Sequence, residues 1–358
     1  MKKKYQTIYD TLKQEIMGGL YGEGEFLPTE QELADRFETS RPTVAKALDM
    51  LRMQKAIERT AGFGTVVLES ELTRGKKIGL LIPRLGQTEI FEPICAAIEE
   101  EGRKHHWQVI RPTGAGDSLS AAKTAERLCL QFIREKTAGV FFSPVEHVSG
   151  GEELNQSIIE RLKDAGIQVV LLDRDVVDWP GQTSCDLIGI DNIQAGYVVA
   201  RHLLDKGCRR IVFATRPAPA PTVKLRIMGC QKALIQSGAS PDALTVQEVP
   251  ENETEPCTEA IMQHQPDGLV CANDATAAIL MRQLIDAGIS IPEPLKVAGF
   301  DDVKYAALLS VPLTTYHQPC DDIGRAAATA MQLRLEHPES APRRTTLQGH
   351  LILRRSTE

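Results

Sequence analysis

Polar side chains that can donate hydrogen bonds gather between residues 29 and 65 in a pattern that favours contact with duplex DNA. The donors nearest one another are Ser40, Arg41, Thr43 and Lys46. They lie at the start and on the open side of a segment whose apolar residues recur at helical spacing. An arginine there can make a bidentate contact to guanine, whereas threonine and lysine suit phosphate contacts, which set register without reading sequence. We therefore expect a DNA-reading helix that enters the major groove by its N-terminus.

Two capped helices would position these donors. Thr29, with Glu32 three residues later, forms a capping box, so a first helix is expected to begin there. Ser40 is expected to cap the second helix, and Pro42 lies in its first turn, where a missing N–H group costs nothing. The short connection between the two predicts a helix-turn-helix.

A glycine-bearing hairpin is expected to follow. Ile57 and the run Thr65–Leu68 read as its two strands, while Gly62 and Gly64 allow its tip to approach a backbone or a minor groove closely. A single capped helix is common in soluble proteins, but two capped helices, a hairpin and a lysine-rich N-terminus together favour DNA binding. The predicted DNA contacts are Lys4, Thr29, Ser40, Arg41, Pro42, Thr43, Lys46, Arg59 and Gly62.

This segment resembles the GntR family of bacterial regulators. The shared motifs are Leu27-Pro-Thr-Glu30, Ser40-Arg-x-Thr-Val44, Ala47-Leu-x-x-Leu51 and Arg59-x-x-Gly-x-Gly-Thr65. They cover about the first 70 residues. The resemblance implies a winged helix-turn-helix that binds double-stranded operator DNA.

The charge of the chain points to dimerisation. The whole chain has a formal net charge of −7, and residues 1–75 hold 11 basic and 12 acidic residues. Positive charge is only local, with five cations and two anions in residues 41–59. Each head would then make few phosphate contacts, so we expect a homodimer on a palindromic operator to supply the rest.

Composition excludes several other classes. With 358 residues the chain is long enough for two or three domains, and no apolar run reaches membrane-spanning length. The Met-Lys-Lys-Lys start leads into a polar amphipathic segment rather than a secretory signal. Eight cysteines stand singly, which favours reduced thiols in the cytoplasm over zinc or disulfides. No cofactor fingerprint, metal spacing or catalytic triad is found, so an enzyme is not expected.

The pattern changes near residue 70. Residues 71–77 read as a polar linker between a DNA-binding domain at 1–70 and a second domain at 78–358. Beyond the linker, short apolar strands alternate with amphipathic helices of ten or more residues, which predicts an α/β fold with doubly wound parallel sheets. Some ten such units exceed one compact sheet, so we expect two lobes, the first at about 78–190 and 319–342 and the second at about 191–318 and 343–358.

Polar residues at the strand ends indicate a ligand site, because ligands of such folds bind in the crevice at the carboxyl ends of the strands. Arg174, Asn273 and Asp301 each follow a strand. Carboxylates, guanidinium groups and amides that meet in a crevice could bind vicinal hydroxyls, with an aromatic ring to stack on a sugar. Asp274 and Asp302 are expected instead to cap the helices that follow them.

From about residue 77 onward the chain resembles the LacI/GalR family, whose effector domain has a periplasmic-binding-protein-like fold. The matching stretches include Leu171-Leu-Asp-Arg174, Ala272-Asn-Asp274, Val297-Ala-Gly-Phe-Asp-Asp302 and Pro312-Leu-Thr-Thr315. The resemblance implies that the ligand contacts are Phe91, Arg174, Arg226, Asn273, Asp301 and Gln318. The chain departs from that family in its GntR-type head and in Gln87–Phe91, and the combination resembles the arabinose-repressor subgroup.

The sequence therefore predicts a sugar-responsive transcriptional regulator, most simply a repressor, with no cofactor. Two alternatives stay open: a regulator that responds to a non-sugar metabolite such as a nucleobase, and an enzyme fused to a regulatory head. The sequence gives neither the effector nor the operator.

Overall fold

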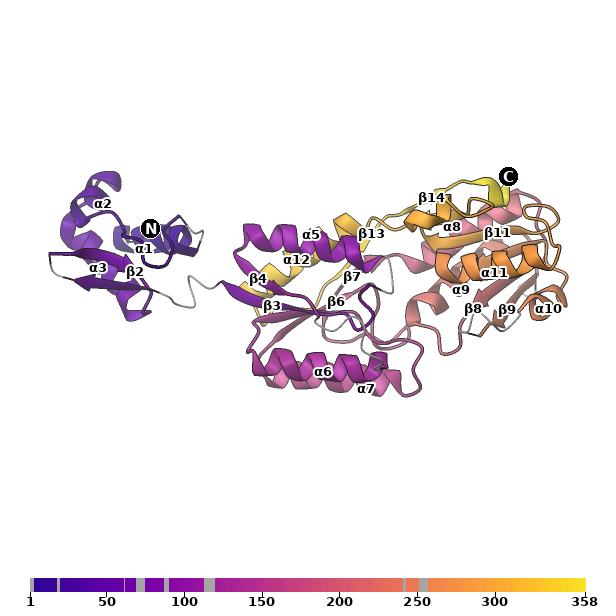
Figure 1. Cartoon of the computed structure of the whole chain (residues 1–358), viewed down its shortest axis with the longest axis horizontal. Helices are drawn as coiled ribbons and strands as arrows, with labels where there is room; N and C mark the ends of the chain where they lie inside the picture. Colours follow the sequence, from indigo (N-terminus) through magenta and orange to yellow (C-terminus); the bar gives the residue numbers. More distant parts are fainter. Residues whose placement is uncertain are drawn as a thin grey trace. The chain divides into compact units, whose positions relative to one another are not determined.

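The computed structural model describes residues 3–17, 20–60, 62–68, 75–86, 90–112, 120–240, 243–250 and 257–358 (Figure 1). The chain divides into two compact units, Met1–Ile78 with Glu99–Ile110, and Gly79–Ile98 with Arg111–Glu358. We call residues 3–68 the head and residues 75–358 the two-sheet domain. Of the expected linker, residues 71–74 lie outside the described residues.

The head is a helix-turn-helix with a hairpin wing. Its elements are α1 (Lys4–Met17), α2 (Glu30–Arg36), α3 (Arg41–Met53), β1 (Ile57–Thr60) and β2 (Gly64–Val67). The strands pair antiparallel, with Thr60 opposite Gly64. Leu12, Leu33, Leu48 and Leu51 are fully buried where the three helices meet, because apolar residues recur on one face of each helix. This packing confirms the fold expected for the head.

The first sheet of the two-sheet domain has the strand order β13-β7-β6-β5-β3-β4. The strands are β3 (Lys76–Leu81), β4 (Trp107–Ile110), β5 (Gly139–Phe142), β6 (Gln168–Leu172), β7 (Asp186–Ile190) and β13 (Arg344–Leu347). Its helices are α5 (Phe91–Lys104), α6 (Ala121–Arg134), α7 (Gly151–Asp164) and α12 (Cys320–Glu336). Figure 1 shows α6 and α7 on one face of the sheet and α12 on the other, as two-sided burial of the strands requires.

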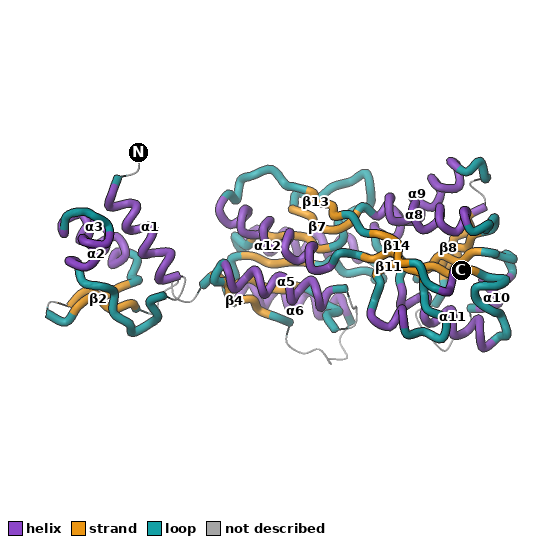
Figure 2. Tube along the Cα trace, turned by 90° about the horizontal axis from the view of Figure 1, so that it is seen from above, coloured by secondary structure: helices purple, strands orange, loops and turns teal. Residues whose placement is uncertain are grey.

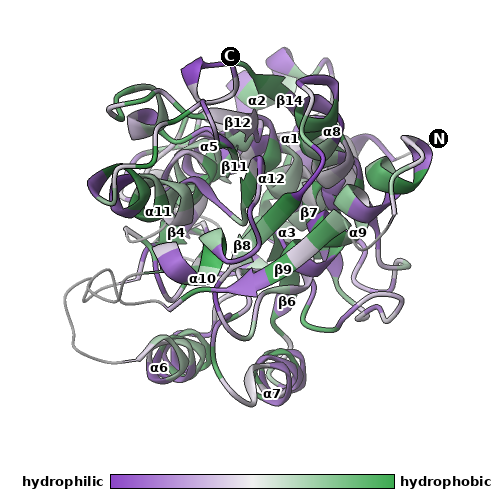
Figure 3. Ribbon diagram, turned by 90° about the vertical axis from the view of Figure 1, so that its right-hand side faces the viewer, coloured by the Kyte–Doolittle hydropathy of each residue, from purple (hydrophilic) through white to green (hydrophobic). Residues whose placement is uncertain are grey.

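The second sheet has the order β14-β12-β11-β10-β8-β9, and only β14 is antiparallel to its neighbour. The strands are β8 (Ile211–Thr215), β9 (Leu244–Glu248), β10 (Gly268–Cys271), β11 (Lys296–Asp301), β12 (Thr314–His317) and β14 (His350–Ile352). Its helices are α8 (Asn192–Asp205), α9 (Pro221–Gln236), α10 (Thr258–Met262) and α11 (Asp274–Asp286), with 3-10 turns η2 (Lys304–Ala307) and η3 (Arg355–Thr357). Figure 3 shows hydrophilic and hydrophobic residues together along the helices, as amphipathic covers require.

The chain passes between the two sheets three times: between β7 and α8, between β12 and α12, and between β13 and β14. These crossings join two lobes, and the expected fold class is confirmed. The sequence-based division placed Arg344–Leu347 with the second lobe, whereas β13 pairs with β7 in the first sheet. Exposed threonines and arginines gave this short edge strand no apolar signal.

Two glycines set the spacing of α8 and α9, which lie side by side (Figure 2). A Cβ atom on Gly196 would overlap the carbonyl oxygen of Arg226, and one on Gly229 would overlap that of Ile193. Close helix packing at these two glycines therefore fixes the backbone that carries Arg226.

The capping pattern differs from the sequence expectation in two places, Asp274 and Asp302. Asn273, rather than Asp274, caps α11 by accepting the Thr276 N–H. Asp274 is fully buried and accepts hydrogen bonds from the Thr315 hydroxyl and the Val303 N–H. Asp302 caps no helix; it bonds His317 and Arg354 instead. Both carboxyl groups connect strand ends, because the partners that they meet there come from distant parts of the sequence.

Candidate functional site

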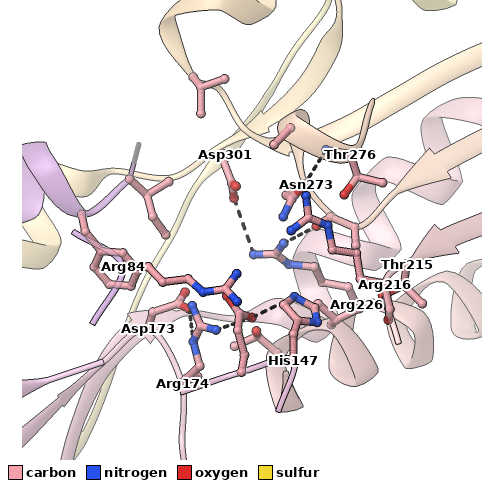
Figure 4. A pocket seen from close by; sticks show the side chains of 18 of the residues that line it. Arg84, His147, Asp173, Arg174, Thr215, Arg216, Arg226, Asn273, Thr276 and Asp301 are labelled. Atoms are coloured by element: carbon pink, nitrogen blue, oxygen red, sulfur yellow. Dashed lines mark hydrogen bonds and ion pairs between the residues drawn. The ribbon is translucent and has the colours of Figure 1, made fainter. Parts of the chain in front are cut away.

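A cavity of about 230 Å³ lies at the carboxyl ends of strands from both sheets. Its lining is mostly polar, and Figure 4 shows side chains entering it from both lobes. The polar lining residues are Arg84, Glu146, His147, Asp173, Arg174, Thr215, Arg216, Thr222, Arg226, Asn273, Thr276, Asp301 and Tyr305. This position is the one where doubly wound folds bind ligands.

Arg174 anchors the wall of the cavity on the first-sheet side. It forms an ion pair with Glu146, and its Nε donates to Asp173 Oδ2 over 3.0 Å. Burial would raise the pKa of Glu146, but the Arg174 guanidinium outweighs it and holds that pKa at about 2. Glu146 is therefore a carboxylate at neutral pH, and the guanidinium is locked in one orientation.

Arg226 anchors the wall on the second-sheet side. Its Nε donates to Asn192 Oδ1 over 2.9 Å, and its Nη1 donates to the Ala272 carbonyl over 2.6 Å. The guanidinium also stacks 4.6 Å from the centre of the Phe300 ring. These contacts do not use Nη2, which faces Asp301 Oδ1 over 3.8 Å (Figure 4). The geometry presents a fixed donor beside a carboxyl group.

Asp301 ends β11 with a φ angle of 111°, in a region that side-chain-bearing residues rarely adopt. Its Oδ1 also accepts from Gln318 Nε2 over 2.7 Å. Burial raises the pKa of Asp301 to about 6, although Arg226 and Gln318 act to lower it. Asp173, at the end of β6, has a φ angle of 70°. Both residues thus have a strained backbone conformation at the carboxyl end of a strand.

Three buried atoms in the lining have no hydrogen-bond partner among the described residues: Arg174 Nη1, Asp173 Oδ1 and Thr276 Oγ1. Arg174 Nη1 forms the ion pair with Glu146, which leaves the two oxygen atoms for a ligand. Asp173 is 7% exposed and Thr276 is 3% exposed. Leaving a buried polar atom unpaired costs about 1–3 kcal/mol. A polar ligand that donates to Asp173 and meets Thr276 would recover this free energy.

The two lobes also touch beside the cavity. The His147 N–H donates to the Ala218 carbonyl over 3.3 Å, and His147 Nδ1 lies 2.9 Å from the Pro217 carbonyl oxygen. Lys224 on α9 forms an ion pair with Asp178 from the loop after β6. The lobes are therefore in a closed arrangement, with the cavity between them.

In the head, α3 exposes the expected donors. Arg41 and Pro42 are exposed at its N-terminus, and the Ser40 hydroxyl lies 2.9 Å from that of Thr43. Ser40 holds the N-cap position, but its side chain makes no bond to a helix N–H. Lys46 Nζ lies 4.2 Å from the centre of the Tyr5 ring. The exposed N-terminal turn of α3 suits entry into a major groove.

The wing is braced against the helices. Arg59 on β1 forms ion pairs with Glu30 on α2 and Asp49 on α3, the second over 3.3 Å. Gly62 is exposed with a φ angle of 80°, and Phe63 beside it is 79% exposed. Two of the nitrogen atoms of Arg59 are therefore already paired with carboxylates.

The comparisons with known proteins match both parts of the chain. Residues 4–67 match the model described as bacterial regulatory proteins, gntR family, and residues 200–357 match that of the periplasmic binding protein-like domain. The arabinose metabolism transcriptional repressor of Geobacillus stearothermophilus is 27% identical over 94% of this chain and 93% of its own. The ribose operon repressor of Escherichia coli K12 is 30% identical over 51% of this chain and 56% of its own.

A LacI family transcriptional regulator from Enterococcus faecium, solved with bound ribose, superposes with a TM-score of 0.65 at 25% identity. The match covers 78% of this chain and 98% of that one. This chain therefore joins a GntR-type head to a periplasmic-binding-protein-like domain whose fold is similar to that of a LacI family regulator. The prediction of a DNA-binding transcriptional regulator is confirmed, and its homologues are repressors rather than enzymes.

Five of the six expected effector contacts in this regulator line the cavity: Phe91, Arg174, Arg226, Asn273 and Asp301. Gln318 does not line it. It is 1% exposed and positions Asp301 through its amide. The side chain of Asn273 is used to cap α11.

The effector contacts predicted from the sequence left out several lining residues, chiefly Arg84, Glu146, Asp173 and Arg216. Arg84 and Arg216 follow β3 and β8 within three residues, so the strand-end rule applied to every strand would have found them. Glu146 is four residues past β5, and no local pattern marks it.

In the head, Thr29 completes its capping box with Glu32, so its hydroxyl is already bonded. Lys4 is exposed, and its Nζ donates to the Glu38 carbonyl over 3.1 Å. No helix in the described part of the chain is long and apolar enough to cross a membrane. Within those same residues, no group of three acidic, histidine or cysteine side chains is placed to hold a metal ion.

Proposed function

We propose that this regulator is a repressor whose operator binding is controlled by a monosaccharide held between its two lobes. The observation that carries the proposal is the cavity itself, with Arg174 and Asp173 on one side facing Arg226 and Asp301 on the other. Guanidinium groups donate and carboxylates accept, so pairs of them suit vicinal hydroxyls, each of which does both.

The size and polarity of the cavity support a small ligand rich in hydroxyl groups. Drug-sized ligands occupy pockets of roughly 300–1,000 Å³ with mostly apolar walls, whereas this cavity is about 230 Å³ and mostly polar. Phe91, at the start of α5, supplies an aromatic ring that can stack on a sugar. Relatives named for arabinose and ribose regulation, and the neighbour solved with ribose, support the same ligand class.

A sugar that contacts both lobes binds the closed arrangement more tightly than an open one, so it shifts the population toward closure. If the closed and open states differ in operator affinity, the coupling free energy is typically about 1–3 kcal/mol, or 5–150-fold in DNA affinity. The hydrogen bonds of His147 and the ion pair of Lys224 would close the lobes over the ligand.

For the head we propose direct readout by Arg41 and phosphate contacts by Thr43, Lys46 and Lys4, with the wing at Gly62 beside the DNA. Few cations per head favour a homodimer on a palindromic operator. A protein whose partner is an operator works where the DNA is, and we place it in the cytoplasm.

The test begins with selection of a duplex from a random library, followed by gel shift at fixed salt. Arg41→Ala should lose the sequence-specific complex while calorimetric sugar binding stays intact. Arg226→Ala and Asp301→Ala should keep the complex but lose its response to sugar. Unchanged DNA binding by Arg41→Ala would discard the head assignment, and a normal sugar response in both cavity variants would discard the site.

Experiments on the same protein test the two alternative functions. Calorimetry with nucleobases in place of monosaccharides tests the non-sugar regulator. Incubation of the protein with monosaccharides, followed by chromatography to detect any product, tests whether it is an enzyme.

A further inference from the structure

Guanidinium groups outnumber carboxyl groups around the cavity. Among the described lining residues, four are arginines and three are acids; the arginines are Arg84, Arg174, Arg216 and Arg226, and the acids are Glu146, Asp173 and Asp301. Figure 4 shows the arginines reaching the same space from both lobes. Four positive charges against three negative ones leave the lining with a charge of +1. A neutral sugar gives no reason for this excess, because each hydroxyl donates as readily as it accepts.

Each of the three acids lies beside an arginine of the lining. Glu146 and Asp173 both lie against Arg174, and Asp301 lies beside Arg226. Burial raises the pKa of Asp301 to about 6, which makes the lining more positive still in mildly acidic solution. Charge inside a cavity acts more strongly than at the surface, since the local dielectric constant is lower.

The excess positive charge lies on the second-sheet side, where Arg216 and Arg226 face the single acid Asp301 and two helices begin at the cavity wall. The 16-residue helix α9 contributes Thr222 from its first turn, and the 13-residue helix α11 contributes Thr276 from its first turn. Helix N-termini favour anions because of their N–H groups and dipole. Arg216 follows β8 on the same wall.

An independent observation, an unpartnered buried hydroxyl group, indicates that a ligand binds at this wall. Thr276 is 3% exposed, it lines the cavity, and its Oγ1 has no hydrogen-bond partner among the described residues. A hydroxyl can donate to an anionic oxygen, and such charge-assisted hydrogen bonds are about twice as strong as neutral ones.

We propose that the effector is a monosaccharide that carries one acidic substituent, a carboxylate or a phosphate, bound by Arg216 and Thr276 at the N-termini of α9 and α11. The hydroxyl groups of the same sugar would lie between Arg174 with Asp173 and Arg226 with Asp301. This inference rests on the proposed sugar-responsive function and narrows its ligand class.

Calorimetry on the full-length protein with matched ligand pairs tests the inference. The pairs are D-galacturonate with D-galactose, D-gluconate with D-glucose, D-glucose 6-phosphate with D-glucose, and D-ribose 5-phosphate with D-ribose. In at least one pair the acidic member should bind 10-fold or more tighter, and the pair that shows it tells carboxylate from phosphate. Arg216→Gln should weaken that acidic ligand by about 10–100-fold, the range of one charged hydrogen bond. The affinity for the neutral member should fall by a much smaller factor.

Arg201→Gln is the matched control, because Arg201 also belongs to the second lobe but pairs with Asp205 on the surface of α8. It should bind both members of the pair like the unmodified protein. If the neutral member binds as tightly as the acidic one in every pair, or if Arg216→Gln weakens both equally, the inference is overturned while the sugar-responsive function stands. If no sugar of either kind binds, both proposals fall.

Discussion

Replacing Asp301 with asparagine should make the two-sheet domain more stable above pH 6 while weakening its response to sugar. Asp301 is partly buried at the end of β11, where the protein disfavours its ionised form and raises its pKa from 3.8 to about 6. Asparagine has nearly the same shape and keeps the Oδ1 atom that accepts from Gln318. It removes the charge that burial penalises.

The size of the effect follows from linkage. Below pH 3.8 the carboxyl group is protonated in both the folded and the unfolded chain, so it does not lower the free energy of unfolding. Between pH 3.8 and 6 the unfolded chain loses the proton first, and the free energy of unfolding falls as the pH rises. Above pH 6 the loss is complete, at about 3 kcal/mol for a shift of roughly two units. Relative to the unmodified protein, Asp301→Asn should therefore gain about 1.5 kcal/mol at pH 5 and about 3 kcal/mol at pH 8.

Urea unfolding followed by tryptophan fluorescence measures this gain. The chain has two tryptophans, Trp107 and Trp179, and both lie outside the head, so the signal reports the two-sheet domain. Asp322→Asn, which changes an exposed carboxylate on α12, is the control and should show no gain. A stability difference that does not grow between pH 5 and pH 8, or an Asp301→Asn protein less stable at both, would refute the reasoning.

Three further predictions concern Arg41 in the head, Arg226 in the cavity and the packing of α8 against α9 at Gly229. Arg41→Ala should lower the affinity for the selected operator by about 1–3 kcal/mol and relax the base preference at one position, as measured by gel shift at fixed salt; equal loss on random duplex would contradict direct readout. Arg226→Ala should abolish sugar binding in calorimetry yet leave the operator complex, and retained sugar affinity would remove it from the site. Gly229→Ala, whose new Cβ would meet the Ile193 carbonyl, should destabilise the two-sheet domain by about 2–3 kcal/mol in urea. An unaffected midpoint would show that α8 and α9 can separate freely.

Much of the fold was predictable because local signals agreed with the tertiary structure. Strand Gln168–Leu172 and helix Phe91–Lys104 begin and end where the apolar pattern places them. The capping box at Thr29 is formed as its residue types predict. In these segments a single periodicity decides the structure, and burial then reinforces it.

The rest depends on contacts that no local pattern encodes. Asp274 and Asp302 follow strands as cap residues often do, but Thr315 and Arg354, 41 and 52 residues away, provide stronger partners. Arg59 looks like a DNA contact by its motif, yet Glu30 and Asp49 already bind it. For the cavity, the strand ends were predictable in principle, whereas Glu146 reaches the site only because the loop after β5 folds back onto Arg174.

The most direct test is the affinity of the full-length protein for its operator during a titration with neutral and acidic monosaccharides. Fluorescence anisotropy measures this affinity at a fixed salt concentration of about 0.15 M. The account predicts a sequence-specific complex whose affinity changes about 5–150-fold at saturating ligand, with Arg226→Ala unresponsive. An affinity that no monosaccharide changes, or one that is the same for selected and random duplex, would contradict it.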